Sequence, residues 1–307
     1  MIYTVTLNPA LDYFVQLEQW NEGGVNRSTY DHKAPGGKGI NVSRVLKRLG
    51  HESEALGFIG GFTGHYVKEV IEQEQVSTRF IQVNGDTRIN VKIKSDTESE
   101  INGASPEITE EHIEQLKQQL ELLNEGDVLV LAGSVPATIP ADIYEVLCTE
   151  ARKKKADVFV DSSGEPMNKV LKHKPTFIKP NHHELGDLFQ VKLKTPDDAV
   201  PYVRELLAKG ITYVLVSFAG DGAILGTTDK ILFANTPKGV VQNSVGAGDS
   251  VVAGFIAAKA EQMDLEQSFK FAVATGSATA FSKGFATRED VEALMKEINI
   301  VVMERDE

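Results

Sequence analysis

The stretch DVLVLAGSVPATIPADIYEVLCTEARKKKADVFV, residues 127–160, contains the pattern that decides the fold. A short apolar strand at 127–132 is followed by a helix at about 140–155 and by a second apolar strand at 157–160. Apolar strands that alternate with helices are typical of parallel sheets with helices packed on both faces. The stretch therefore predicts a repeating strand–helix–strand unit within an α/β protein.

The same alternation continues on both sides of this stretch. We expect further strands at 2–7, 55–59, 176–179, 212–217, 222–226 and 230–235. Helices are expected at 39–49, 64–74, 109–123, 165–172, 183–189, 196–209, 248–261, 264–283 and 287–298. In the first of these helices, apolar residues recur at i, i+3, i+4 and i+7, which is the spacing of an amphipathic helix. The order of elements predicts a mainly parallel central sheet that is covered on both faces.

Two segments, residues 12–34 and 86–104, break this order because neither contains a helical pattern. From Thr87 to Lys94, apolar residues stand at every second position, which predicts a strand with one buried and one solvated face. Such strands do not fit a doubly covered sheet. We expect the two segments to form a small, discontinuous β layer that projects from a single domain spanning 1–307. Its apolar face needs a cover, either a site over which it closes or a second subunit.

Composition narrows the classes of protein that the chain can belong to. In its 307 residues, 44 acidic side chains outnumber 32 basic ones, and the net charge is −12. Nucleic-acid binding needs a clustered basic face, so we expect no nucleic-acid partner. The longest apolar runs fall far short of the roughly 20 residues of a membrane-spanning helix, so we expect no membrane partner. The single cysteine, Cys148, and the lack of a secretory pattern predict a cytoplasmic protein.

The first motif with chemical content is Pro-Gly-Gly-Lys-Gly-Ile-Asn at residues 35–41, which leads into an expected helix. Glycines permit close backbone approach, and the free N–H groups of a helix N-terminus attract anions. Lys38 adds a full positive charge, and Asn41 lies in the first helical turn. The motif suits a polar or anionic ligand, although a tight strand-to-helix turn explains the two adjacent glycines as well. It does not match the phosphate-binding pattern G-x-x-x-x-G-K-[ST].

A second glycine-rich motif, Asn-Ser-Val-Gly-Ala-Gly-Asp-Ser at residues 243–250, leads into an apolar helix. The backbone N–H groups of Ala247, Gly248 and Asp249 are candidates for an anion hole. The carboxylate of Asp249 is placed to take a proton from an attacking hydroxyl group. An ordinary helix N-cap explains Asp249 equally well at this point. The third glycine of a dinucleotide-binding fingerprint is missing, which argues against an NAD-dependent oxidoreductase.

Further polar residues follow the expected strands at the edge where open α/β sheets bind ligands. Asn181 and Glu184 offer oxygen atoms one helical turn apart, a spacing that suits Mg²⁺ held partly through water. A surface helix cap is the simpler interpretation of this pair. Asp12 follows the first strand, and Arg88 on the projecting strand is a candidate to bind an anion from above. The turn at 217–222 has, by itself, the features of an ordinary hairpin.

Taken together, these motifs resemble those of the ribokinase-like (PfkB) carbohydrate kinases. The patterns Gly-Gly-Lys-Gly-x-Asn at 36–41 and Gly-Ala-Gly-Asp-Ser at 246–250 stand in the order of that family, about 210 residues apart. The Asn-x-x-Glu pattern at 181–184 and the turn at 217–222 also match, so the resemblance covers essentially the whole chain. It implies a three-layer αβα sandwich with a mainly parallel central sheet and a small β-sheet lid.

The resemblance also implies roles for individual residues. Asp249 would be the general base, and Gly246, Ala247 and Gly248 would form the anion hole for the transferred phosphoryl group. The sugar phosphate would contact Asp12, Gly37, Lys38, Asn41 and Arg88. ATP would contact Asn181, Ser217, Phe218, Ala219, Gly220, Asp221, Gly222 and Gly248. Glu184 would hold Mg²⁺ through water.

Within the family, residues 6–12, 87–92 and 100–103 resemble the hexose-phosphate branch. This implies ATP-dependent phosphorylation of a ketohexose monophosphate, first D-fructose 1-phosphate, with tagatose 6-phosphate as the alternative and fructose 6-phosphate also open. Lys38, Arg88 and either Arg27 or Lys92 would meet the phosphate already on the sugar. A non-catalytic sugar-phosphate sensor is the alternative from a different class, which a retained base disfavours. The lid implies a homodimer.

Overall fold

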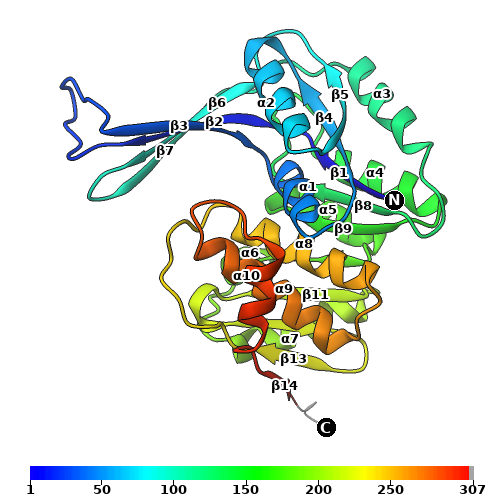
Figure 1. Ribbon diagram of the computed structural model, residues 1–307. Helices are drawn as coiled ribbons and strands as arrows, with labels where there is room; N and C mark the ends of the chain where they lie inside the picture. The colour runs from blue at the N-terminus through cyan, green and yellow to red at the C-terminus, as the bar shows by residue number, and fades with distance from the viewer. Residues whose placement is uncertain (304–307) are drawn as a thin grey trace.

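The structure, a computed structural model, describes residues 1–303 and contains two β-sheets (Figure 1). The larger sheet has ten strands in the order β14-β13-β12-β11-β10-β9-β8-β1-β4-β5. Its strands are β1 Ile2–Thr6, β4 Glu54–Ile59, β5 Ser77–Gln82, β8 Val128–Ala132, β9 Asp157–Asp161, β10 Phe177–Ile178, β11 Tyr213–Ser217, β12 Ala223–Gly226, β13 Ile231–Ala234 and β14 Ile300–Met303. The seven strands from β11 to β5 in this spatial order pair in parallel, and β12, β13 and β14 add antiparallel pairs at the other edge. The expected mainly parallel sheet is confirmed.

Helices cover both faces of this sheet (Figure 1). They are α1 Lys38–Arg48, α2 Gly61–Gln73, α3 Glu110–Leu120, α4 Ile143–Lys153, α5 Gly164–Val170, α6 His182–Phe189, α7 Pro196–Ala208, α8 Ala247–Ala260, α9 Leu265–Ala280 and α10 Arg288–Met295, with short 3₁₀ turns at Leu171–His173 and Ala219–Asp221. One apolar core joins the sheet to α3 through α7, and a second joins it to α1, α8, α9 and α10. The helix α2 packs beside α1 through a smaller cluster. These are the three layers that the sequence predicts.

The alternation of side chains along β1 shows how one strand supports both layers. Val5, and Leu7 directly after the strand, belong to the core on the α3–α7 side. Thr4 and Thr6 point to the opposite face, where the Thr4 hydroxyl lies 2.8 Å from that of Ser43 in α1. The hydroxyl oxygen of Thr6 accepts a hydrogen bond of 2.9 Å from the backbone N–H of Ile40. Two polar side chains of β1 therefore fix where α1 begins on the sheet.

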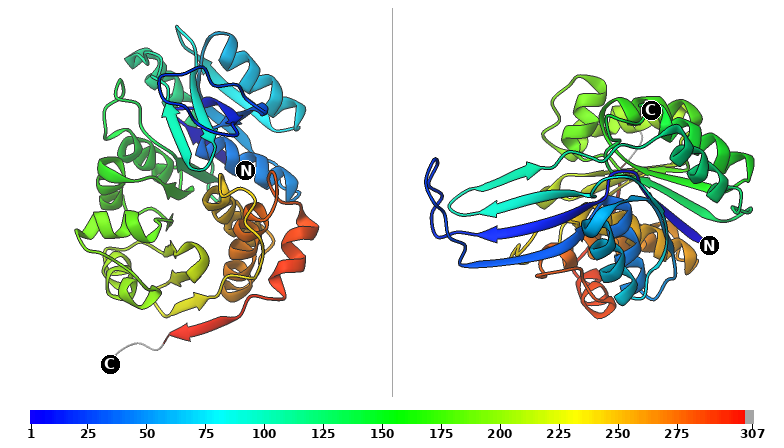
Figure 2. Two further views of the ribbon diagram at one scale, coloured as in Figure 1. Left: turned by 90° about the vertical axis from the view of Figure 1, so that its left-hand side faces the viewer. Right: turned by 90° about the horizontal axis from the view of Figure 1, so that it is seen from above.

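The smaller sheet projects from the body as a four-stranded arm (Figures 1 and 2). Its order is β3-β2-β6-β7, and its strands are β2 Ala10–Gln16, β3 Tyr30–Gly36, β6 Arg88–Lys94 and β7 Glu98–Asn102. The register pairs Asp12 with Asn90, and the two side chains lie on the same polar face. Tyr13 pairs with Val91 on the other, apolar face. The expected small β-sheet lid is confirmed.

Three strands lacked a sequence signal strong enough to place them. The segment Ser77–Gln82 has no strict alternation, and Tyr30–Gly36 is exposed and polar over most of its length. The edge strand β14 follows a turn directly after α10 and carries only four residues. The expected helix at 264–283 ends earlier, at Ala280, because the turn that contains Gly284 follows it. Pairing partners, more than local sequence, determine these short edge strands.

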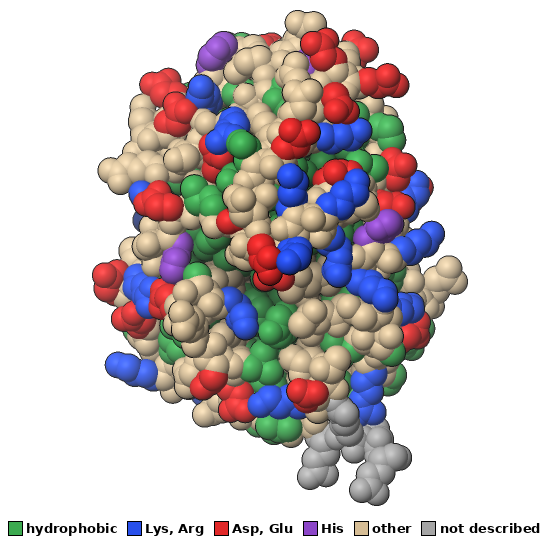
Figure 3. All heavy atoms as spheres, turned by 90° about the vertical axis from the view of Figure 1, so that its right-hand side faces the viewer, with side chains coloured by type: hydrophobic (Ala, Val, Ile, Leu, Met, Phe, Trp, Pro, Cys, Tyr) green, Lys and Arg blue, Asp and Glu red, His purple; other side chains and the backbone are tan. Residues whose placement is uncertain are grey.

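The surface opposite the projecting sheet carries acidic and basic side chains interspersed over the whole view (Figure 3). Mixed signs of this kind favour solubility over the binding of a polyanion. Within residues 1–303, no helix is both long enough and apolar enough to cross a membrane.

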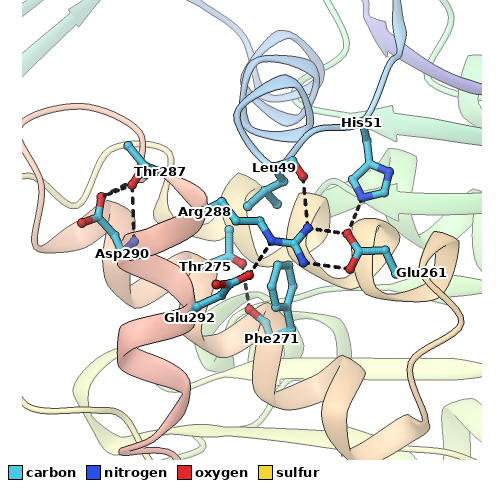
Figure 4. Close-up of polar contacts among 9 residues, drawn as sticks. All are labelled: Leu49, His51, Glu261, Phe271, Thr275, Thr287, Arg288, Asp290 and Glu292. Carbon is cyan, nitrogen blue, oxygen red and sulfur yellow. Dashed lines mark hydrogen bonds and ion pairs between the residues drawn. The ribbon is translucent and has the colours of Figure 1, made fainter.

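A polar cluster ties together the C-terminal ends of α1 and α8, the ends opposite the two glycine motifs (Figure 4). Arg288, the first residue of α10, pairs with both carboxylate oxygens of Glu261 and also donates to the backbone carbonyl of Leu49. His51 lies 2.8 Å from the same carboxylate. These hydrogen bonds, those from Arg288 foremost, lower the pKa of Glu261 from 4.5 to about 2.

We expect Glu261→Gln to lower the free energy of unfolding by about 1 kcal/mol at pH 7, because it weakens a bidentate pair at the surface. A depressed folded-state pKa contributes stability above the unfolded value, and this contribution is lost as the pH falls from about 4.5 towards 2. The gap between wild type and variant should therefore close over that interval. Urea unfolding at pH 7 and pH 3 measures it. Glu150→Gln, which removes an exposed pair with Lys153, is the matched control; an equal effect in both variants would contradict this account.

Candidate active site

The N-termini of α1 and α8 meet above the carboxyl ends of the central strands, and a side chain of α1 contacts one of α8. The side-chain amide of Asn41 donates a hydrogen bond of 2.8 Å to the carboxylate of Asp249, although 208 residues separate them. Asp249 is only 6% exposed and Asn41 8%. The structure thus joins the two glycine-rich motifs at one buried carboxylate.

Gly37 permits α1 to begin so close to the sheet. Its φ of +131° lies in a region that favours glycine, and a Cβ there would come 2.6 Å from the methyl group of Thr6. Its neighbour Gly36 is equally constrained, because a Cβ there would lie 2.5 Å from the carboxylate of Asp12. The pair of glycines therefore does more than form a turn: it brings Asp12 against the start of α1.

Gly246 caps α8 with a left-handed backbone, φ +79°, so it is the N-cap residue. Asp249 lies three residues further on, and its side chain bonds to Asn41 and not to the end of its own helix. The N-cap interpretation of Asp249 therefore does not hold. In this first turn the N–H of Ala247 donates to the carbonyl of Ser244 at 3.2 Å, and Asp249 lies at the positive end of the helix dipole.

Two lysines and a second buried aspartate complete the charged centre. The ammonium group of Lys38 donates to Asp161 at 2.9 Å, and that of Lys179 lies 3.4 Å from its other oxygen. Lys179 is 3% exposed, and its Nζ would lie 3.3 Å from a Cβ placed on Gly248. Burial alone would raise the pKa of Asp161, but Lys179 and Lys38 hold it below its usual range. The centre thus contains a buried cation directly beside the glycine turn of α8.

The same environment that lowers the pKa of Asp161 raises the pKa of Asp249. Burial, and then the negative charge of Asp161, raise the pKa of Asp249 to about 6. Lys38, the hydrogen bond from Asn41 and Lys179 oppose the rise. Two neighbouring carboxylates therefore have pKa values pushed apart, which is a common arrangement where one group must accept a proton near neutral pH. The charge of Asp161 also raises the pKa of Lys38.

A cleft of about 930 Å³ opens beside this centre. The residues predicted for the nucleotide, phosphoryl and metal sites that line it are Asn181, Glu184, Ser217, Ala219, Gly220, Gly222, Gly246, Ala247, Gly248 and Asp249; of the residues predicted for the sugar phosphate, Lys38 lines it. Its other walls include Val241, Ala280 and Phe281. Phe218 and Asp221 are not part of the lining; Phe218 is 2% exposed and its ring stacks on His182 at 5.2 Å. Phe218 therefore packs against the start of α6.

Asn181 and Glu184 form a reciprocal cap at the start of α6. The side chain of Asn181 accepts from the backbone N–H of Glu184, and the carboxylate of Glu184 accepts from the N–H of Asn181, both at 2.8 Å. The simpler cap interpretation is therefore correct for their mutual geometry, and it engages one of the two oxygens of Glu184. Glu184 still lines the cleft. Among residues 1–303 no cluster of three or more acidic, His or Cys side chains is placed to hold a metal ion alone.

The polar face of the projecting sheet adds a second group of candidates. Asp12 is 8% exposed and accepts a hydrogen bond of 2.9 Å from Asn90; burial raises its pKa. Arg88 donates to the backbone carbonyl of Asn8 at 3.1 Å, and its Nε is buried without a protein partner. Burial lowers the pKa of Arg88. A half-buried guanidinium group with an unused donor is well suited to an anionic ligand.

The other two candidate cations are placed differently. Lys92 lies on the same polar face but is paired with Glu100 at 2.8 Å. Arg27 is exposed on the loop between β2 and β3. Neither lines the cleft.

Sequence reasoning missed Asp161, Lys179 and Asn90. Asp161 ends β9, and Lys179 directly follows β10, so both occupy the ligand-binding edge of the sheet. Their place at the ends of two strands was the only signal in the sequence. It does not predict that the side chains of Asp161 and Lys179 turn inwards and meet Lys38 and Asp249.

Residues 4–292 match the pfkB family carbohydrate kinase, and the chain belongs to this family. It is 51% identical over 300 residues to the 1-phosphofructokinase of Bacillus subtilis (strain 168), with 98% of this chain and 99% of the relative covered. It is 35% identical over 301 residues to a D-tagatose-1-phosphate kinase of Bacillus licheniformis, with coverage of 98% and 99%. The crystal structure of Escherichia coli phosphofructokinase-2 with substrates and products superimposes with a TM-score of 0.91 at 30% identity, covering 96% and 98% of the two chains. The same Escherichia coli protein has a tetrameric inhibited form.

These comparisons confirm the ribokinase-like fold and the sugar-kinase class that the motifs predict. They exclude the dinucleotide-dependent oxidoreductase. The roles of individual residues remain predictions, which the geometry above makes specific.

Proposed function

We propose that this kinase transfers the γ-phosphoryl group of ATP to the free primary hydroxyl of D-fructose 1-phosphate, giving fructose 1,6-bisphosphate and ADP. The observation that carries the proposal is the buried carboxylate of Asp249, bonded to Asn41 and set at the N-terminus of α8. The relationship to the Bacillus subtilis enzyme supports the choice of sugar.

Asp249 acts as the general base. Its pKa of about 6 leaves it ionised at neutral pH yet basic enough to take the hydroxyl proton as the new O–P bond forms. The bond between the γ-phosphorus and the bridging oxygen of ADP breaks in the same transfer. Asn41 holds the carboxylate in one orientation, which keeps it ready for an incoming hydroxyl.

The backbone N–H groups of Gly246 and Gly248 bind the oxygens of the phosphoryl group in transit, and that of Ala247 joins them once it leaves the carbonyl of Ser244, to which it donates at 3.2 Å. Lys179, 3.3 Å from the Cβ position of Gly248, and Lys38 neutralise charge at the same point. Phosphoryl transfer depends mainly on positioning and charge neutralisation, so this set is chemically sufficient. Asp12, Gly37, Lys38, Asn41 and Arg88 bind the sugar phosphate.

The walls of the cleft bind ATP through the turn that starts at Ser217 and through Asn181. The donor set fits magnesium, since Mg²⁺ is usually held by one or two carboxylates, water and substrate phosphates. Glu184 would hold it, with water between; when bound, Mg²⁺ neutralises the phosphate charges of the nucleotide.

The test is a comparison of kcat/KM by coupled ADP release for fructose 1-phosphate, tagatose 6-phosphate, tagatose 1-phosphate and fructose 6-phosphate. We expect fructose 1-phosphate to rank first. Tagatose 6-phosphate in first place would make the chain a kinase that forms tagatose 1,6-bisphosphate. No ADP from any sugar phosphate would support a sensor instead of an enzyme.

The raised pKa of Asp249 predicts the pH dependence of catalysis. Because the base must be ionised, kcat should fall tenfold per pH unit below about pH 6. Removing the hydrogen bond that lowers this pKa, in Asn41→Ala, should move the acid limb of the kcat profile to higher pH.

The second pKa of the substrate phosphate also lies near 6, so an acid limb near pH 6 does not by itself identify Asp249. The movement of that limb in Asn41→Ala is therefore the decisive measurement. A limb that stays in place in Asn41→Ala would belong to the substrate and contradict the assignment to Asp249.

The apolar face of the projecting sheet supports a homodimer. Ile89 and Ile101 on this face are 41% and 57% exposed, and a second copy of the same face is a matching cover. Sedimentation should give a dimer for the wild type and a monomer for Ile101→Lys, whereas Val302→Lys on the far edge of the large sheet should leave the dimer intact.

The free, buried Cys148 and the phosphorylated substrates favour a cytoplasmic location.

A further inference from the structure

The loop at residues 281–287, between α9 and α10, lies against the first turn of α8. The ring of Phe285 rests on Gly246, where an added Cβ would be 2.5 Å from the ring atom Cε1. Gly246 is the N-cap residue and the first member of the proposed anion hole. A half-buried aromatic side chain therefore supports the back of this backbone turn.

Helix α1 holds Phe285 from the other side with two arginines one turn apart. The guanidinium group of Arg44 stacks over the ring with 4.8 Å to its centroid. Arg48 donates to the backbone carbonyl of Phe285 at 2.5 Å. Arg44 is itself fixed by two hydrogen bonds to Glu74, of 2.7 and 2.6 Å, and is only 12% exposed. Two contacts from α1 thus set the position of Phe285.

A second line of contacts, made of hydroxyl groups, reaches the same turn. The Ser250 hydroxyl donates to the backbone carbonyl of Gly246 at 2.8 Å and lies 2.9 Å from that of Thr279. Thr279 in turn accepts from the backbone N–H of Ala286, the residue after Phe285, at 3.3 Å. The loop and the glycine turn are therefore connected on two sides.

We infer that Phe285 is a positioning residue for phosphoryl transfer: its ring, clamped by Arg44, holds Gly246 where the anion hole matches the transition state. The inference rests on the proposed function. Anion-hole donors act on charge that develops only during transfer, so a displaced turn lowers kcat and leaves ground-state binding almost unchanged. A displacement of about 1 Å in such a site can cost about 10²-fold in rate.

The experiment measures kcat, KM for the sugar phosphate, and the affinities for ADP and for ADP with aluminium fluoride, a mimic of the phosphoryl group in transit. Phe285→Ala should lower kcat about 10- to 100-fold, with KM and ADP affinity within about twofold of wild type. Affinity for the aluminium fluoride complex should fall by the same factor as kcat. Phe285→Tyr keeps a ring for Arg44 and should stay within about threefold of wild type.

Phe189→Ala is the matched control, because Lys209 lies over that ring at 5.4 Å, away from the cleft. It should leave kcat unchanged. The double variant Arg44→Lys/Phe285→Ala should be no slower than Phe285→Ala, since the two side chains act as a unit. If Phe285→Ala does not fold, Arg44→Lys replaces it as the test variant: it should lower kcat by about a few fold at unchanged KM, and an unchanged kcat would overturn the inference.

Near-normal kcat in Phe285→Ala would overturn the inference, as would a loss of ADP affinity equal to the loss of kcat. An inactive wild-type chain would instead overturn the proposed function itself.

Discussion

Asp249→Asn should lower kcat by about 10²–10⁴-fold or more, because an amide cannot take the proton of the acceptor hydroxyl. The amide has the same shape as the carboxylate and retains an oxygen for the hydrogen bond from Asn41. Nucleotide and sugar phosphate should therefore still bind, with dissociation constants near those of the wild type. Steady-state kinetics and calorimetric titration with ADP measure the two quantities separately.

The same variant should not be less stable than the wild type. A carboxyl group whose folded-state pKa is raised disfavours folding above that pKa, where it is ionised in both states. Asn removes the buried charge, so thermal unfolding at pH 7 should occur at the same temperature or higher. Near-normal turnover would refute the role of Asp249 as base, and a lower unfolding temperature would contradict its environment as described.

Lys179→Met should have the second largest effect, a loss of about 10²–10³-fold in kcat. The buried ammonium group of Lys179 lies directly beside the glycine turn of α8, 3.3 Å from the position of a Cβ on Gly248. Without it, the pKa of Asp249 should also rise, because Lys179 is one of the groups that lower it. The acid limb of the kcat profile should then move to higher pH.

Stability needs a separate measurement for this variant, because Asp161 loses one of its two cationic partners. Breaking a buried pair costs about 3–5 kcal/mol when no other partner remains. Lys38 remains here, so the folded state should persist. Lys169→Met, which removes an exposed pair with Glu165, is the control. If Lys179→Met keeps kcat within threefold of wild type, the buried cation has no part in the transfer.

The sequence predicts the α/β layers well because apolar strands and amphipathic helices follow from periodicity alone. It also marks Asp249 and Lys38, since glycines before a helix are a local signal. Asp161 and Lys179 carry no such signal: their meaning depends on strands β9 and β10 lying side by side. The reciprocal capping between Asn181 and Glu184 can also be predicted from local sequence. That Glu184 lines the cleft depends on the tertiary structure and cannot.

Phe285 shows a further limit of sequence reasoning. An aromatic residue in a loop gives no sign that Arg44, 241 positions earlier in the chain, stacks on it. Such contacts arise only once α1 and the C-terminal helices share one face of the sheet. The supporting parts of the site are therefore less predictable than its reactive groups.

The 208-residue separation of Asn41 and Asp249 also has a consequence during synthesis of the chain. A ribosome must translate past α8 before the two helix N-termini can meet, and α9 and α10 must follow before α8 is covered. Contacts of such long range form slowly, and domains of this size fold through intermediates. A nascent or truncated chain can complete the early strands of the sheet and still lack any catalytic centre. Phosphorylation therefore begins only when nearly the whole polypeptide has folded.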